Sequence, residues 1–331
     1  MNGRIPATIV TGFLGAGKTT LIRNLIAKAR GRRLAIIVNE FGDLGFDGGL
    51  IADCDDDCRP DQIVELTNGC ICCTVADEFL PAMEALLERD PAPDHIVIET
   101  SGLALPQPLV RAFAWPGVRQ KVTVDGVVTV VDAAAVAEGR LAPAPTGPGP
   151  AREHDDPVEE LFEDQLRCAD LVIVSKADLL DEAGLASVEE VVRRETRPGT
   201  STLRSTGGGV VPEVLLGLAS ATEANMAGRE SHHDLEGEEH DHDDFESCVL
   251  SPAPFRSLDE VKARVGAALA VPGVLRIKGR AAVSGRAAPA VVQAVGPRVE
   301  TWFSPEMTAP GLVVIGLKGF DRGAVEARLG G

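Results

Sequence analysis

The feature of this sequence that most restricts its fold is the stretch "GFLGAGKTT" at residues 12–20. It fits the pattern G-x-x-x-x-G-K-[ST], in which a glycine-rich loop joins a buried strand to the first turn of a helix. The apolar run "ATIVTG" (7–12) precedes the loop, and the helical pattern "KTTLIRNLIAKA" follows it. This context favours a phosphate-binding P-loop over a chance glycine-rich turn.

The P-loop pattern assigns a role to each part of the motif. Backbone N–H groups of such a loop turn toward phosphate oxygens at the start of the helix. The Lys18 ammonium can reach the β- and γ-phosphates, and the Thr19 hydroxyl can bind Mg²⁺. The predicted nucleotide-binding residues of the loop are Gly12, Gly15, Ala16, Gly17, Lys18, Thr19 and Thr20.

Short apolar runs alternate with helical patterns up to residue 206. The runs are near-continuous Val, Ile and Leu, which is typical of parallel strands buried on both faces. Strands are expected at 7–12, 33–39, 95–100, 122–133, 170–178 and 200–206, and helices at 18–29, 75–89, 157–169 and 185–195. Repeated strand–helix units predict an α/β fold of the P-loop NTPase type, with a doubly wound, mostly parallel sheet.

An acidic, histidine-rich stretch interrupts this rhythm and predicts a domain boundary. It has few residues that could pack in a core, so a loose linker is expected at 223–246. The P-loop domain is then 1–222, and a small α+β domain occupies 247–331. In that domain, strands are expected near 246–251, 273–283, 289–296, 298–303 and 311–317, and helices near 257–269 and from 321.

The charge of the chain restricts its partners. The formal net charge is -18, and an acidic surface repels phosphate backbones, which argues against nucleic acid and anionic membranes as partners. No apolar run approaches the ~18 residues of a membrane span, and no export signal is recognisable. We therefore expect a cytoplasmic protein whose seven cysteines are reduced thiols.

The stretch "HIVIETSG" (95–102) predicts a second part of the nucleotide site. Glu99 ends a buried strand, so its carboxylate can face Mg²⁺ and its waters and orient the attacking water. Gly102 would let the backbone approach the γ-phosphate. The alternative is a strand-end carboxylate that is merely solvated at the sheet edge. Because this stretch occurs together with a P-loop, we expect Lys18 and Glu99 to be the catalytic residues.

The stretch "SKAD" (175–178) predicts the part of the site that binds the base. Asp178 can accept two hydrogen bonds from the guanine edge, and the Lys176 stem can lie across the ring. The stretch resembles the guanine-specificity motif of GTPases, which usually begins with Asn. Ser175 stands in that place, so weaker discrimination between guanine and adenine is expected. The alternative is that Asp178 only caps the next helix.

The stretch "NGCICCTV" (68–75) predicts a transition-metal site. Cys70, Cys72 and Cys73 precede a helical pattern, and a helix N-terminus favours the metal-binding thiolate over the thiol. The spacing is too tight for a four-cysteine zinc knuckle, so other ligands or water must complete the site. An incomplete site suits a metal that is released again. Buried, inert cysteines are the alternative.

The glycine-rich acidic stretch 39–58 lies where P-loop proteins keep a nucleotide-sensing loop. Glu40 and Asp47 are candidate ligands of the metal or of Mg²⁺. Cys54 and Cys58 could form a second thiolate site, although a solvated acidic loop is the favoured interpretation. The histidines at 154, 232, 233, 240 and 242 could catch metal or belong to a disordered acidic linker. His95, Cys168 and Cys248 are expected to be structural.

Five motifs in order resemble the CobW-type metallochaperone GTPases over almost the full chain: "GFLGAGKTT", "NEFGDLGFDG", "ELTNGCICC", "IVIETSGLALPQPL" and "SKAD". Stretches such as "LRIKGRAAV" and "VVQAVGPRVETWF" resemble the members associated with cobalamin biosynthesis. The resemblance implies a G3E-type GTPase domain with Mg²⁺-GTP, slow hydrolysis to GDP and a metal held by the C-x-C-C thiols. It also implies delivery of Co²⁺ to a client, cobaltochelatase.

The residues do not choose the metal, because thiolate sites bind Zn²⁺ more tightly than Co²⁺. A zinc chaperone of the same family is therefore the nearest alternative. A metal buffer or sensor with a purely structural nucleotide is an alternative from another class. A P-loop kinase for a small metabolite is a third, disfavoured by Asp178 and the thiols.

Overall fold

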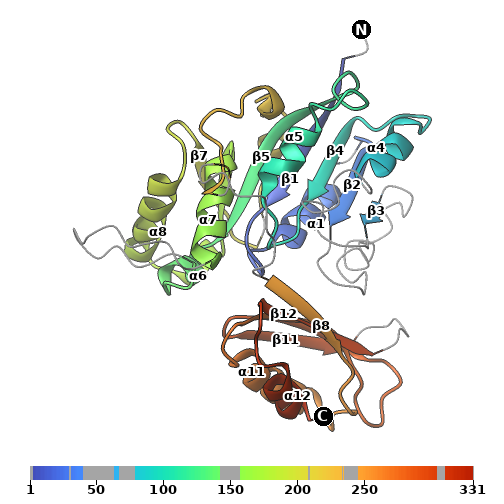
Figure 1. The fold of residues 1–331 in the computed structure, drawn as a ribbon, viewed down its shortest axis with the longest axis vertical. Helices are drawn as coiled ribbons and strands as arrows, with labels where there is room; N and C mark the ends of the chain where they lie inside the picture. The colour runs from blue at the N-terminus through green and yellow to red at the C-terminus, as the bar shows by residue number, and fades with distance from the viewer. Residues whose placement is uncertain are drawn as a thin grey trace. The chain divides into compact units, whose positions relative to one another are not determined.

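The computed structural model describes two compact units, each with its own core. The described residues are 3–29, 31–39, 63–66, 79–141, 157–207, 209–232, 234, 245–303 and 310–330. Those up to residue 234 belong to the first unit, and those from residue 245 belong to the second. Figure 1 shows the sheet and helices of each unit.

The first unit is built on a seven-stranded sheet in the order β3-β2-β4-β1-β5-β6-β7, in which every neighbouring pair is parallel. The strands are β1 (Ile5–Thr11), β2 (Leu34–Asn39), β3 (Ile63–Leu66), β4 (His95–Glu99), β5 (Val122–Asp132), β6 (Leu171–Ser175) and β7 (Ser201–Arg204). β1 lies between β4 and β5 in the middle of the sheet (Figure 1). The carboxyl ends of these three strands therefore meet at one edge, where ligands of open α/β sheets bind.

Helices cover both faces of this sheet. They are α1 (Lys18–Lys28), α4 (Leu80–Leu87), α5 (Pro106–Ala112), α6 (Ala133–Ala137), α7 (Pro157–Cys168), α8 (Glu182–Glu195) and α9 (Pro212–Leu215). Successive residues of a strand point to opposite faces, so Ile9 packs in the cluster with α4 and α5, and Val10 packs in the cluster with α1. Burial on both faces explains the unbroken apolar runs, and the predicted doubly wound α/β fold is confirmed.

The second unit is an antiparallel sheet with two helices. Its strands, in the order β11-β10-β9-β12-β8, are β8 (Phe245–Leu250), β9 (Val274–Ala281), β10 (Ala290–Val295), β11 (Arg298–Phe303) and β12 (Gly311–Leu317). The helices α11 (Leu258–Leu269) and α12 (Arg322–Leu329) contribute Val261, Val265 and Val325 to its core. This is the predicted α+β domain, with every predicted strand and helix in place.

The start of the predicted linker differs from the loose segment expected there. Residues 222–232 pack against the rest of the first unit. They begin with the short 3₁₀ helix η4 (Thr222–Ala224). The Arg229 side chain is only 2% exposed and donates to the backbone oxygen of Cys168 and to the Asp170 carboxylate. Polar contacts fix this stretch to the first unit. It is therefore ordered although its sequence has no apolar pattern.

No helix within the described parts of the chain is long and apolar enough to cross a membrane.

Candidate nucleotide-binding site

The loop between β1 and α1 has the geometry of an anion cradle. Gly12 has φ 133°, and a Cβ atom there would lie 2.1 Å from the backbone oxygen of Val130, so only glycine fits against β5. Gly17 is the N-cap of α1 in the left-handed conformation, and no side chain caps the first turn. The first backbone N–H groups of a helix have no partner inside it and carry its positive end, which suits a bound phosphate.

Lys18 places its charge inside this loop. The residue is 6% exposed, and its Nζ donates to the backbone oxygens of Gly12 at 2.7 Å and Phe13 at 3.2 Å. The ammonium is therefore already at the loop that would surround the phosphates. A bound anion could exchange with these carbonyl contacts over a short distance.

Thr19 and Glu99, predicted from separate motifs, meet directly. β1 and β4 are parallel neighbours with Val10 opposite Glu99, so the end of β4 lies beside the start of α1. The Thr19 hydroxyl donates to Glu99 Oε1 at 2.8 Å, and Glu99 is 4% exposed. A hydroxyl and a carboxylate are the hard oxygen donors that Mg²⁺ takes in nucleotide sites, so this donor pair fits that ion.

The loop after β4 packs tightly on the P-loop. A Cβ atom at Gly102 would lie 2.7 Å from Leu14 N and 2.5 Å from Leu14 Cδ2. From the other side, Gln165 Nε2 on α7 donates to the backbone oxygens of Gly102 at 3.3 Å and Ala104 at 3.1 Å. The loop is thus held between the P-loop and α7, where it could respond to a γ-phosphate.

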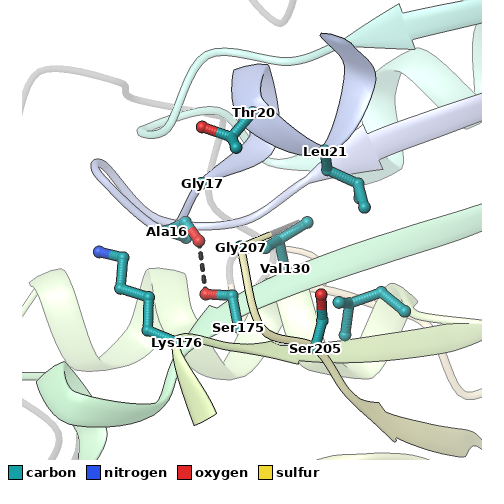
Figure 2. Close-up of a pocket in the computed structure, with 10 residues that line it drawn as sticks. Ala16, Gly17, Thr20, Leu21, Val130, Ser175, Lys176, Ser205 and Gly207 are labelled. Atoms are coloured by element: carbon teal, nitrogen blue, oxygen red, sulfur yellow. Dashed lines mark hydrogen bonds between the residues drawn. The ribbon is translucent and has the colours of Figure 1, made fainter. Parts of the chain in front are cut away.

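The end of β6 holds the P-loop from the opposite side. The Ser175 hydroxyl lies 2.6 Å from the backbone oxygen of Ala16 (Figure 2). It also lies 3.0 Å from the backbone oxygen of Val131. Ser175 was predicted only to weaken guanine recognition. In the fold it is buried and ties β6 to the phosphate loop, a role that a hydroxyl can fill without the Asn amide.

Lys176 and Asp178 follow this tether. Lys176 Nζ lies 2.7 Å from the backbone oxygen of Gly15 and 2.5 Å from Asp132 Oδ2. Asp178 is exposed in the 3₁₀ helix η3 (Ala177–Leu179). Its carboxylate is therefore open to a ligand, while Lys176 spans the distance between β6 and the P-loop.

A pocket of about 90 Å³ lies between these elements (Figure 2). Ala16 and Gly17 of the P-loop, Thr20 on α1, Lys176 and Ser205 contribute to its lining. Thr20 was a predicted nucleotide contact, whereas Ser205, just after β7, was not among the predicted residues. Nothing in "LRSTGGG" beyond its glycines marks Ser205 in the sequence.

Asp132 is the other residue that the motifs missed. It ends β5 as Glu99 ends β4, and its carboxylate contacts Lys176. The signal that identified Glu99, an acidic residue at the end of a buried strand, is also present in "VVTVVDA". The predicted strand 122–133 includes Asp132, so the residue was not recognised as a strand-end carboxylate.

The predicted thiolate site lies outside the described residues. This applies to Cys70, Cys72 and Cys73, to Glu40 and Asp47, and to Cys54 and Cys58. Within the described ranges no group of three or more His, Cys, Asp or Glu side chains could hold a metal ion. Cys168 is buried there, and burial raises the pKa of its thiol to about 12, which makes it a poor metal ligand.

A glycine-rich loop before an uncapped helix, a lysine inside it and a buried carboxylate on the adjacent strand define a P-loop nucleotide-binding protein. Two sequence families match the chain: "CobW/HypB/UreG, nucleotide-binding domain" at residues 6–204, and "Cobalamin synthesis protein cobW C-terminal domain" at residues 245–331. The chain therefore belongs to the CobW/HypB/UreG family of G3E P-loop GTPases, which confirms the resemblance seen in the motifs.

Curated relatives span nearly the whole chain. "Zinc chaperone CobW" of Sinorhizobium sp is 49% identical over 99% of this chain and 97% of its own length. "Zinc chaperone CobW" of Pseudomonas aeruginosa is 44% identical over 98% and 91%. Among solved structures, Zn(II)-bound YjiA GTPase from E. coli is 22% identical, with a TM-score of 0.43 and 98% of both chains covered. The family and the two curated relatives support a metallochaperone GTPase, and the names of these relatives specify zinc where cobalt was predicted.

Proposed function

We propose that this protein is a GTP-dependent metallochaperone that binds GTP with Mg²⁺, hydrolyses it slowly to GDP and thereby controls release of a bound transition metal. The observation that carries the proposal is the meeting of Lys18, Thr19 and Glu99 at one P-loop in a chain of this family. The metal is the cargo, and the thiolates of Cys70, Cys72 and Cys73 are its proposed ligands.

Separate groups of the described residues bind the phosphates, Mg²⁺ and the attacking water. Lys18 and the N–H groups at the start of α1 bind and orient the phosphates by charge and hydrogen bonding. Thr19 and Glu99 would hold Mg²⁺, which when bound neutralises the charge that develops on the phosphates. The buried Glu99 carboxylate also orients the attacking water, and the Gly102 loop responds to the γ-phosphate.

The base is proposed to be guanine. The exposed Asp178 carboxylate can accept both hydrogen bonds of the guanine N1–H and N2–H₂ edge, a donor pair that adenine lacks. Ser175 supports the P-loop through its hydroxyl, so it need not contact the base.

The cargo metal is proposed to be zinc. Two relatives that span nearly the whole chain carry zinc in their names, and thiolate sites prefer Zn²⁺ over Co²⁺. The description of the C-terminal family, a cobalamin synthesis domain, favours cobalt delivered to cobaltochelatase as the second candidate. Competition between Zn²⁺ and Co²⁺ for the GTP-loaded protein under buffered metal separates the two. If the GTP-loaded protein preferred Co²⁺, cobalt rather than zinc would be the cargo metal.

The coupled switch is tested by metal affinity with a non-hydrolysable GTP analogue and with GDP. We expect tighter metal binding with the GTP analogue, and linkage then requires that metal tightens GTP binding by the same factor. Equal metal affinities in the two nucleotide states would exclude the switch.

Lys18→Ala separates the chaperone from a metal buffer. The variant should lose GTP hydrolysis and the nucleotide dependence of metal binding, while Lys28→Ala, at the exposed end of the same helix, should lose neither. A buffer with a structural nucleotide would keep its metal response in both variants. Hydrolysis measured without any acceptor distinguishes a GTPase from a small-molecule kinase.

A further inference from the structure

The Asp132 carboxylate joins two parts of the molecule. It is 6% exposed at the end of β5. Oδ1 accepts from the backbone N–H groups of Ala134 at 3.1 Å and Ala135 at 3.2 Å, which caps α6. Oδ2 lies 2.5 Å from Lys176 Nζ. The cap of α6 uses Oδ1 only. The contact of Oδ2 with Lys176 is therefore not needed for the cap.

Lys176 has an uncommon backbone conformation. Its φ of 55° and ψ of 32° lie in the left-handed region, which is sterically unfavourable for a residue with a Cβ atom. Such a conformation persists where surrounding contacts fix it, and it is concentrated at ligand sites. Here the Gly15 backbone oxygen and Asp132 fix the Nζ end.

Each contact of the ammonium restricts the aliphatic stem of Lys176. The stem runs from the end of β6 toward the P-loop (Figure 2), and Lys176 lines the same pocket as Thr20 and Ser205. A lysine fixed before the ligand arrives loses less side-chain entropy when a ring packs on its stem. The paired carboxylate also balances the ammonium charge beside a neutral base.

We propose that Asp132 is a positioning residue for the purine base: it holds Lys176 in the orientation in which its stem covers the ring bound at Asp178. Asp132 acts through Lys176 and does not touch the nucleotide. The inference rests on the proposed guanine-nucleotide binding and adds a determinant of base affinity to it.

Asp132→Asn tests the role because Asn caps a helix as well as Asp does but carries no charge for Lys176. We expect GDP affinity to fall about 10-fold, in keeping with the loss of a charge-assisted hydrogen bond. Affinity for inorganic pyrophosphate, which has no base, should stay within 2-fold, and Tm should not change. The matched control is Asp181→Asn, because Asp181 caps α8 and is exposed.

A double-mutant cycle adds a measurement independent of the cap. Lys176→Met keeps an aliphatic stem without the ammonium, so it should reduce GDP affinity like Asp132→Asn, and the double variant should lose little more. Unchanged GDP affinity in Asp132→Asn, equal losses for GDP and pyrophosphate, or additive losses would overturn the positioning role. A wild-type protein that bound GDP no better than pyrophosphate would overturn the guanine site as well.

Discussion

At the residue scale, Gly102 sets how closely the loop after β4 approaches the P-loop. Gly102→Ala would place a Cβ atom 2.7 Å from Leu14 N, so one of the two loops must shift. We expect a loss of about 1–3 kcal/mol in the free energy of unfolding and slower GTP hydrolysis, measured by urea titration and phosphate release. Gly117→Ala is the control, since nothing lies within 4 Å of that Cβ position. Equal behaviour of the two variants would contradict the tight packing.

His95 gives the fold a calculable response to acid. It is 4% exposed, with Nε2 2.8 Å from Thr8 Oγ1. Burial lowers its pKa from 6.5 to about 4, against an opposing effect of the Asp125 charge. The unfolded chain therefore binds a proton below pH 6.5 that the folded chain refuses, so this contribution to stability is present above pH 6.5 and is lost toward pH 4.

The measurement is the free energy of unfolding between pH 5 and pH 7 for the wild type and His95→Gln. The part due to His95 should decline with falling pH by at most ~1.4 kcal/mol per unit. Gln does not titrate, so the difference between the two proteins should shrink as the pH falls. Parallel curves would show that His95 is not the group responsible.

At the element scale, the sequence was informative wherever a structure follows from neighbouring residues. The P-loop is one continuous motif, and the long strands were predicted because burial on both faces leaves unbroken apolar runs. β3, α5, α6 and α9 were missed, since segments of four to seven residues are too short to show a period. The contacts Ser175–Ala16 and Lys176–Asp132 join residues 159 and 44 positions apart, and no local pattern records such pairs.

The segment 222–232 shows the same limit and provides an element-scale prediction. Arg229 holds it through the Cys168 backbone oxygen, the Asp170 carboxylate and the Asn225 backbone oxygen. Arg229→Ala leaves a buried carboxylate short of one cation, so we expect a loss of about 2–4 kcal/mol in the free energy of unfolding. Arg193→Ala removes an exposed ion pair instead and should have no measurable effect. Urea titration of both variants checks this, and a negligible effect of Arg229→Ala would mean that the segment is dispensable for stability.

At the scale of the whole molecule, the two units differ in charge. Residues 245–331 contain eleven Lys and Arg against seven Asp and Glu, so +4 of the formal charge of -18 lies there and -22 lies in the rest. The argument against polyanionic partners therefore applies to the first 244 residues. Among the described residues the two units share no core residue, because the cluster around α11 and α12 contains only residues from 250 to 329.

Separate cores predict separate unfolding. A nucleotide at the P-loop stabilises only the unit that binds it, by about 2.7 kcal/mol at 100 times its dissociation constant. We expect GDP with Mg²⁺ to raise the first unit's transition by roughly 5–10 °C and to leave the second unit's transition unchanged, measured by calorimetry of the full chain. The isolated fragment 245–331 identifies the second transition, and the Lys18→Ala chain should lose the GDP response of the first. If GDP shifted both transitions together, the two units would unfold cooperatively despite their separate cores, which would contradict this prediction.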